Sequence, residues 1–110
     1  MPELKNKIFG TSVRIPTNNV SMIDLNVKLG CYIEFHELMR LLRTCKEIEV
    51  SDDPHLVSSD FMTTKCPTII DSHASMMMGD NEFKFTIWYD NEWSYSCQAL
   101  KLIEHIDKDI

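Results

Sequence analysis

Cysteine and histidine are the residues best suited to nucleophilic catalysis and metal binding, and the chain contains four of each. Cys31 and His36 are close enough in sequence to suggest a thiol and a general base. No third residue follows to orient the imidazole, and no catalytic motif surrounds the thiol, so we expect His36 on a helix surface. The other cysteines and histidines lack metal-ligand spacing, and we expect free thiols and no metal site.

Two other side chains have the chemistry to hold a ligand. Arg14 carries a permanent charge and can bind phosphate oxygens through two parallel hydrogen bonds. Its apolar neighbours, Val13 and Ile15, equally fit a strand residue that points to solvent. Asn91 offers both a donor and an acceptor, which suits a ligand amide, although its position between two acidic residues also fits a turn or a helix N-cap.

These side chains must be positioned by strands and helices, which the apolar pattern predicts. Apolar and polar residues alternate from Ile23 to Leu29 and from Phe83 to Tyr89, as in half-buried strands. Steps of three and four residues between apolar positions predict amphipathic helices at Phe35–Cys45 and Ala99–Ile106. We expect the second helix to begin near Trp93, and Cys45 to be a small core residue of the first.

Shorter apolar runs predict four further strands, at Ser12–Ile15, Ile48–Val50, Ile69–Ile70 and Met76–Met78, the last of them packed in the core. Leu56–Phe61 fits either a strand or a structured loop. This order of elements is typical of an α+β fold, with a mainly antiparallel or mixed sheet and helices packed on it. No G-x-G-x-x-G unit is present, so we expect no nucleotide-binding Rossmann domain.

The composition limits the classes of partner. The 110 residues correspond to one small domain, and the formal net charge is −6, from 11 basic and 17 acidic side chains. Such a charge disfavours binding to nucleic acid or to an anionic membrane surface. No apolar run is long enough to span a membrane, and the N-terminus lacks the apolar core of a signal peptide. We therefore expect a cytoplasmic protein.

Three stretches are too particular to follow from fold propensity. Arg14–Leu25 reads RIPTNNVSMIDL, Val57–Phe61 reads VSSDF and Trp88–Ser96 reads WYDNEWSYS. Together with the preceding Pro-Glu-Leu, they resemble, in the same order and at similar spacing, motifs of the C-terminal catalytic domain of glyceraldehyde-3-phosphate dehydrogenase. The resemblance spans essentially residues 1–110, with a small deletion around Lys46–Glu49. It implies an incomplete copy of that domain.

The resemblance implies roles for individual residues. Arg14 matches the arginine that holds substrate or inorganic phosphate. Asn91 matches the asparagine that hydrogen-bonds the nicotinamide carboxamide of NAD, and Tyr89 and Tyr95 match tyrosines that line the pocket. Ser94 stands where the family usually has glycine at the entrance to a helix, a change that would weaken close approach of a cofactor if the glycine serves that purpose.

The catalytic machinery of the family is missing from these residues. Its nucleophilic cysteine lies in an S-C-T-T-N-type motif, followed by a histidine in a later strand, and none of the four cysteines here has that context. We therefore expect a truncated, catalytically inactive protein that binds no NAD alone and associates with itself or with full-length homologous subunits. The alternatives are one piece of a split NAD-dependent enzyme of glycolysis, completed by another polypeptide, and a small regulatory or host-interaction module.

Overall fold

The computed structural model describes residues 2–108 as a four-stranded sheet with two α-helices. Short 3₁₀ turns, η1 (Pro2–Leu4) and η2 (Ser58–Phe61), lie outside the sheet. The remaining elements, in chain order, are β1 (Ser21–Lys28), α1 (Phe35–Leu42), β2 (Glu49–Ser51), β3 (Ile69–Gly79), β4 (Glu82–Tyr89) and α2 (Trp93–Lys108). The predicted α+β class and mixed sheet are confirmed.

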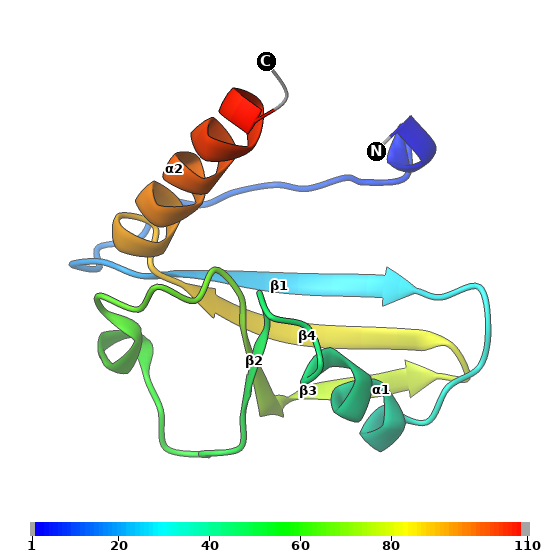
Figure 1. Cartoon of the computed structure of the whole chain (residues 1–110). Helices are drawn as coiled ribbons and strands as arrows, with labels where there is room; N and C mark the ends of the chain where they lie inside the picture. The colour runs from blue at the N-terminus through cyan, green and yellow to red at the C-terminus, as the bar shows by residue number, and fades with distance from the viewer. Residues whose placement is uncertain (1, 109–110) are drawn as a thin grey trace.

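The strand order in the sheet is β1-β4-β3-β2, so β1 and β2 are the two edges (Figure 1). β4 lies between two antiparallel neighbours, and β2 is parallel to β3. The register pairs Ser21 with Tyr89 at one end of the β1–β4 ladder and Lys28 with Glu82 at the other. The start of β1 and the end of β4 therefore meet at the same end of the sheet.

Helix α1 covers one face of the sheet because its apolar stripe repeats at the helical period. Met39, on this stripe, is buried in a core of side chains from β2, β3 and β4, together with Val50, Ile70, Phe83, Phe85 and Ile87. A second cluster forms near the start of β1, where Val20, Phe61 and Ile69 are buried and Trp88 packs against them. Trp88 stacks on Phe61 with ring centroids 5.5 Å apart.

The predicted pair of strands around residues 69–78 is a single strand, β3, with a bulge between Asp71 and Met76. Side chains replace ladder bonds there: the Asp71 carboxylate accepts from the backbone N–H groups of His73 and Ala74, and the Ser75 hydroxyl accepts from the N–H of Thr86. The polar residues between the two predicted strands therefore lie in an irregular part of one strand.

Three expectations about local structure are wrong. Ser12–Ile15 forms no strand; the segment is exposed and unpaired within the described residues. Helix α1 ends at Leu42, so Cys45 lies beyond it and is exposed. Met76 and Met78, expected in the core, are 53% and 49% exposed because they point to the sheet face opposite α1.

Helix α2 extends away from the sheet beyond the end of β4 (Figure 1). Its predicted apolar face is present, but Leu102, Ile103 and Ile106 are all more than half exposed. Only Ser94, in its first turn, is buried. Within residues 2–108, no helix combines the length and the apolar character needed to span a bilayer.

Candidate functional site

Asp90, which directly follows β4, is the most heavily hydrogen-bonded side chain at the end of the sheet. It is fully buried. Its Oδ2 accepts from Asn19 Nδ2 at 3.0 Å and from the backbone N–H of Thr63 at 2.7 Å. Its Oδ1 accepts from the N–H groups of Glu92 and Trp93, each at 2.8 Å. One carboxylate therefore joins the segment before β1, the loop after η2 and the start of α2.

These bonds set the charge state of Asp90. Burial by itself raises the pKa of a carboxyl group, because it penalises the ionised form. The hydrogen bonds from Trp93, Glu92, Thr63 and Asn19 outweigh burial and lower the pKa of Asp90 from 3.8 to about 2. The side chain is therefore an anion at neutral pH, and its only described partners are donors.

The lowered pKa predicts how stability depends on pH. Because the folded-state pKa lies below the unfolded one, Asp90 stabilises the fold fully above about pH 5, and this contribution is lost as the pH falls through about 2. A pKa shift of this size corresponds to a contribution of about 2 kcal/mol to the free energy of unfolding at neutral pH. Urea unfolding from pH 2 to 7 should show this fall in the wild type and a smaller one in D90N. If the free energy of unfolding falls equally with pH in the wild type and in D90N, Asp90 is not the group responsible for the fall.

Asn91 lies next to this buried carboxylate and is exposed. Its Oδ1 accepts a hydrogen bond from Ser21 Oγ at 3.1 Å, and its Nδ2 has no partner among residues 2–108. The interpretation of Asn91 as a helix cap is wrong, since Asp90 accepts the bonds from the first turn of α2. The amide of Asn91 is thus left free to donate to a ligand.

The two tyrosines lie on either side of Asn91 in the chain. Tyr89 ends β4 and is half-buried, whereas Tyr95 is in the first turn of α2 and is 67% exposed. Ser94, between Asn91 and Tyr95 in the chain, is 1% exposed and donates its hydroxyl to the backbone oxygen of Asp90 at 2.7 Å. This serine side chain therefore points into the protein, so it does not occupy the exposed surface beside Asn91.

Arg14 belongs to the exposed N-terminal segment. It makes no hydrogen bond or ion pair with any described residue. Asn19, which is bonded to Asp90, follows five residues later, so the two α-carbons are at most about 18 Å apart along an extended chain. The structure thus brings Tyr89, Asn91 and Tyr95 to one end of β4 and leaves Arg14 tethered to the same end without a contact to them.

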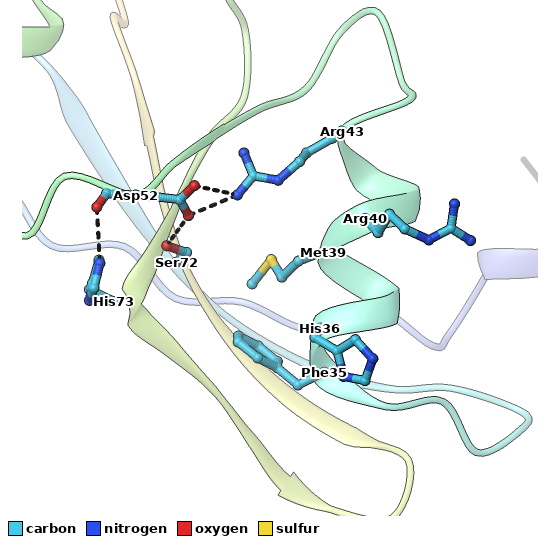
Figure 2. A pocket seen from close by; sticks show the side chains of 8 residues that line it. All are labelled: Phe35, His36, Met39, Arg40, Arg43, Asp52, Ser72 and His73. Carbon is cyan, nitrogen blue, oxygen red and sulfur yellow. Dashed lines mark hydrogen bonds and ion pairs between the residues drawn. The ribbon is translucent and has the colours of Figure 1, made fainter.

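A shallow, open pocket of about 450 Å³ lies elsewhere, between α1 and the β2–β3 side of the sheet (Figure 2). None of the four predicted site residues lines it; its lining residues are Phe35, His36, Met39, Arg40, Arg43, Asp52, Ser72 and His73. His36 is exposed on α1, as expected.

Four polar residues of this pocket, Arg43, Asp52, Ser72 and His73, are joined by hydrogen bonds. Arg43 Nη2 donates to both carboxylate oxygens of Asp52, at 2.8 and 2.7 Å, and Ser72 Oγ donates to the same carboxylate at 2.7 Å. Ser72 and Arg43 together lower the pKa of Asp52. Figure 2 shows Arg40 directed away from Asp52. With Arg43, Asp52 and Ser72 bonded to one another, the pocket is a weaker candidate for a ligand site than the end of β4.

The four cysteines are free thiols, as predicted. No group of three metal-ligating side chains occurs within residues 2–108. Sequence reasoning missed Asp90, Asn19 and Ser21 as parts of the site. Their signal was present in the motifs that contain Arg14 and Asn91, but the contacts between residues some 70 positions apart depend on how β1 pairs with β4.

Comparisons with known proteins show which family the chain resembles. The model of the glyceraldehyde 3-phosphate dehydrogenase C-terminal domain family matches residues 1–91. The cytosolic glyceraldehyde-3-phosphate dehydrogenase of Chlamydomonas reinhardtii is 37% identical over 98% of this chain and 33% of its own length. Glyceraldehyde-3-phosphate dehydrogenase 2 of Bacillus subtilis is 37% identical over 96% of this chain and 33% of its own length. Glyceraldehyde-3-phosphate dehydrogenase A of Escherichia coli is 35% identical over 98% of this chain and 34% of its own length.

The residues that the family model matches include most of those that build the end of the sheet. Arg14 to Ser21 leads into β1, and Trp88 to Tyr95 contains the Asp90 anchor and the free amide of Asn91. The chain spans about a third of the length of the curated relatives that it matches. It therefore belongs to the glyceraldehyde-3-phosphate dehydrogenase family and corresponds to part of the C-terminal domain.

Proposed function

We propose that this chain supplies the binding side of a glyceraldehyde-3-phosphate dehydrogenase site together with surfaces for association, and that these 110 residues have no dehydrogenase turnover alone. Arg14 holds the phosphate of the substrate or inorganic phosphate, Asn91 binds the nicotinamide amide of NAD, and Tyr89 and Tyr95 line the pocket. The family's nucleophilic thiol, its histidine and its dinucleotide-binding unit belong to motifs that these 110 residues do not contain.

The observation that carries the proposal is the apolar surface left uncovered on three segments. Apolar side chains are exposed on the N-terminal segment, on edge strand β1 and along α2: Ile8, Phe9, Val13, Ile15, Met22, Ile23, Leu25, Leu100, Leu102, Ile103 and Ile106. Contiguous apolar surface and an unpaired strand edge both favour association with further polypeptide. We infer that self-association or binding to homologous full-length subunits covers these surfaces.

The residues present fit one end of NAD. The Nδ2 of Asn91 is an exposed donor with no partner among the described residues, which suits the carbonyl oxygen of a carboxamide. When bound, NAD would accept the hydride that the aldehyde loses on oxidation. One amide and one arginine give little affinity without further donors, so the chain alone is expected not to retain NAD.

A second candidate is an enzyme completed by another polypeptide, in which Arg14 and Asn91 act in turnover. It is favoured by two groups that have no partner among the described residues, the Arg14 guanidinium and Asn91 Nδ2. The two proposals differ in whether association with another polypeptide restores activity.

Association can be measured directly by sedimentation velocity across a range of concentrations, with and without the Escherichia coli relative. We expect species larger than a monomer, and fewer of them when the exposed apolar residues Leu102 and Ile103 are both changed to glutamate. K108E, which changes the charge by the same amount at an exposed position of the same helix, is the matched control. A compact monomer at all concentrations, unaffected by the relative, would refute the association proposal.

A further inference from the structure

The hydrogen bond between Ser21 and Asn91 gives the amide of Asn91 a direction. An asparagine amide has an acceptor side and a donor side, and its neighbours decide which way each side faces. Here Ser21 Oγ donates to Oδ1 at 3.1 Å. With Oδ1 bonded to Ser21, Nδ2 is the group of this amide that remains without a described partner and can donate to a ligand.

Both ends of this bond are anchored by the same buried carboxylate. Asp90 immediately precedes Asn91, and it accepts from Asn19, two residues before Ser21. The β1–β4 register places Ser21 opposite Tyr89, which is two residues before Asn91. The hydroxyl and the amide are therefore brought within hydrogen-bond distance by the sheet and by Asp90.

The backbone at this anchor is held in an unusual conformation. Val20, between Asn19 and Ser21, has a φ of 73°, and Thr63, whose N–H donates to Asp90, has a φ of 64°. Left-handed backbone is rare for branched side chains, and it persists where surrounding contacts enforce it, often at ligand sites. Val20 is 5% exposed in the cluster with Phe61 and Ile69, which supplies such contacts.

We propose that Ser21 is a positioning residue, which orients the amide of Asn91 so that Nδ2 is presented as a hydrogen-bond donor. The ligand group that this arrangement selects is an acceptor, such as the carbonyl oxygen of a carboxamide or of a ketone in its place. The choice of NAD as the ligand rests on the proposed function, whereas the orientation of the amide does not.

The orientation is tested in the chain itself by NMR relaxation and hydrogen exchange of the Asn91 side-chain NH₂ group, assigned with N91D. We expect a rigid amide in the wild type and in S21T, and a mobile one in S21A. In S21D the carboxylate can only accept a hydrogen bond, so the Asn91 amide should rotate until Nδ2 donates to it. One Nδ2 proton should then be protected from exchange with solvent. An amide equally mobile in the wild type and S21A would overturn the proposal.

The consequence for binding is tested in a chimeric enzyme, in which these 110 residues replace the matching third of the Escherichia coli relative. S21A should raise KM for NAD about three- to tenfold with little change in kcat, and S21T should restore it. An NAD analogue with an acetyl group in place of the carboxamide keeps the acceptor oxygen and should show the same dependence on Ser21. A mobile amide in S21A with KM for NAD unchanged would overturn the positioning role, and an inactive chimera would count against the proposed function alone.

Discussion

Replacing Asp90 by alanine is expected to lower the free energy of unfolding by about 3 to 5 kcal/mol. The change removes one acceptor from four donors, namely Asn19 Nδ2 and the N–H groups of Thr63, Glu92 and Trp93. A hydrogen bond to a charged group contributes about 1.5 to 3 kcal/mol, and buried donors left without a partner carry a further desolvation cost. The contributions are coupled, so they do not add in full.

Two variants make this measurement specific. D90N keeps the shape and one acceptor oxygen but turns an NH₂ group toward two of the donors, and about half of the loss is expected. D24A removes an exposed carboxylate that pairs with Lys84, and it should change stability by less than about 1 kcal/mol. The comparison is made by urea unfolding at pH 7. A loss from D90A no larger than that from D24A would show that Asp90 does not hold the end of the sheet together.

The second large effect is expected for Arg14 in the chimeric enzyme. If Arg14 binds phosphate, R14A should raise KM for inorganic phosphate or for the phosphorylated substrate by about 10- to 100-fold, as expected for the loss of a charge-assisted hydrogen bond. R14K should recover part of this, because lysine keeps the charge and loses the paired geometry.

Arg40 provides the matched control for this prediction. It is also an exposed arginine, but it forms an ion pair with Glu37 on α1 and lies on a helix outside the predicted site. R40A should leave the kinetic constants of the chimera unchanged. Equal effects of R14A and R40A would mean that Arg14 contributes only general charge.

The regular elements were predictable because burial on one face imposes a period on the sequence. Alternation over residues 23–29 and 83–89 located β1 and β4, and the three- and four-residue steps after Phe35 located α1. The strand predicted at Ser12–Ile15 is absent because a short apolar run alone does not make a strand. A short apolar run becomes a strand only if another strand accepts its hydrogen bonds, and no described segment pairs with it.

The candidate site was predictable only in part. The motif resemblance proposed Arg14, Asn91 and the two tyrosines as site residues, but it did not point to the carboxylate beside Asn91 that anchors this end of the sheet. Asp90 acts through Asn19 and Thr63, which lie 71 and 27 residues away in sequence. Such contacts follow from the β1–β4 register and from the left-handed backbone at Val20 and Thr63, and neither leaves a local pattern in the sequence.

The central claim is that this chain brings binding groups but no catalytic thiol to the dehydrogenase reaction. The most direct test follows NADH formation from glyceraldehyde 3-phosphate, NAD and phosphate by the chain alone, by the chimera, and by the chimera with serine in place of the cysteine of its S-C-T-T-N motif. We predict no turnover by the chain, turnover by the chimera, and its loss in the serine variant. Measurable NADH formation by the chain alone would contradict the account.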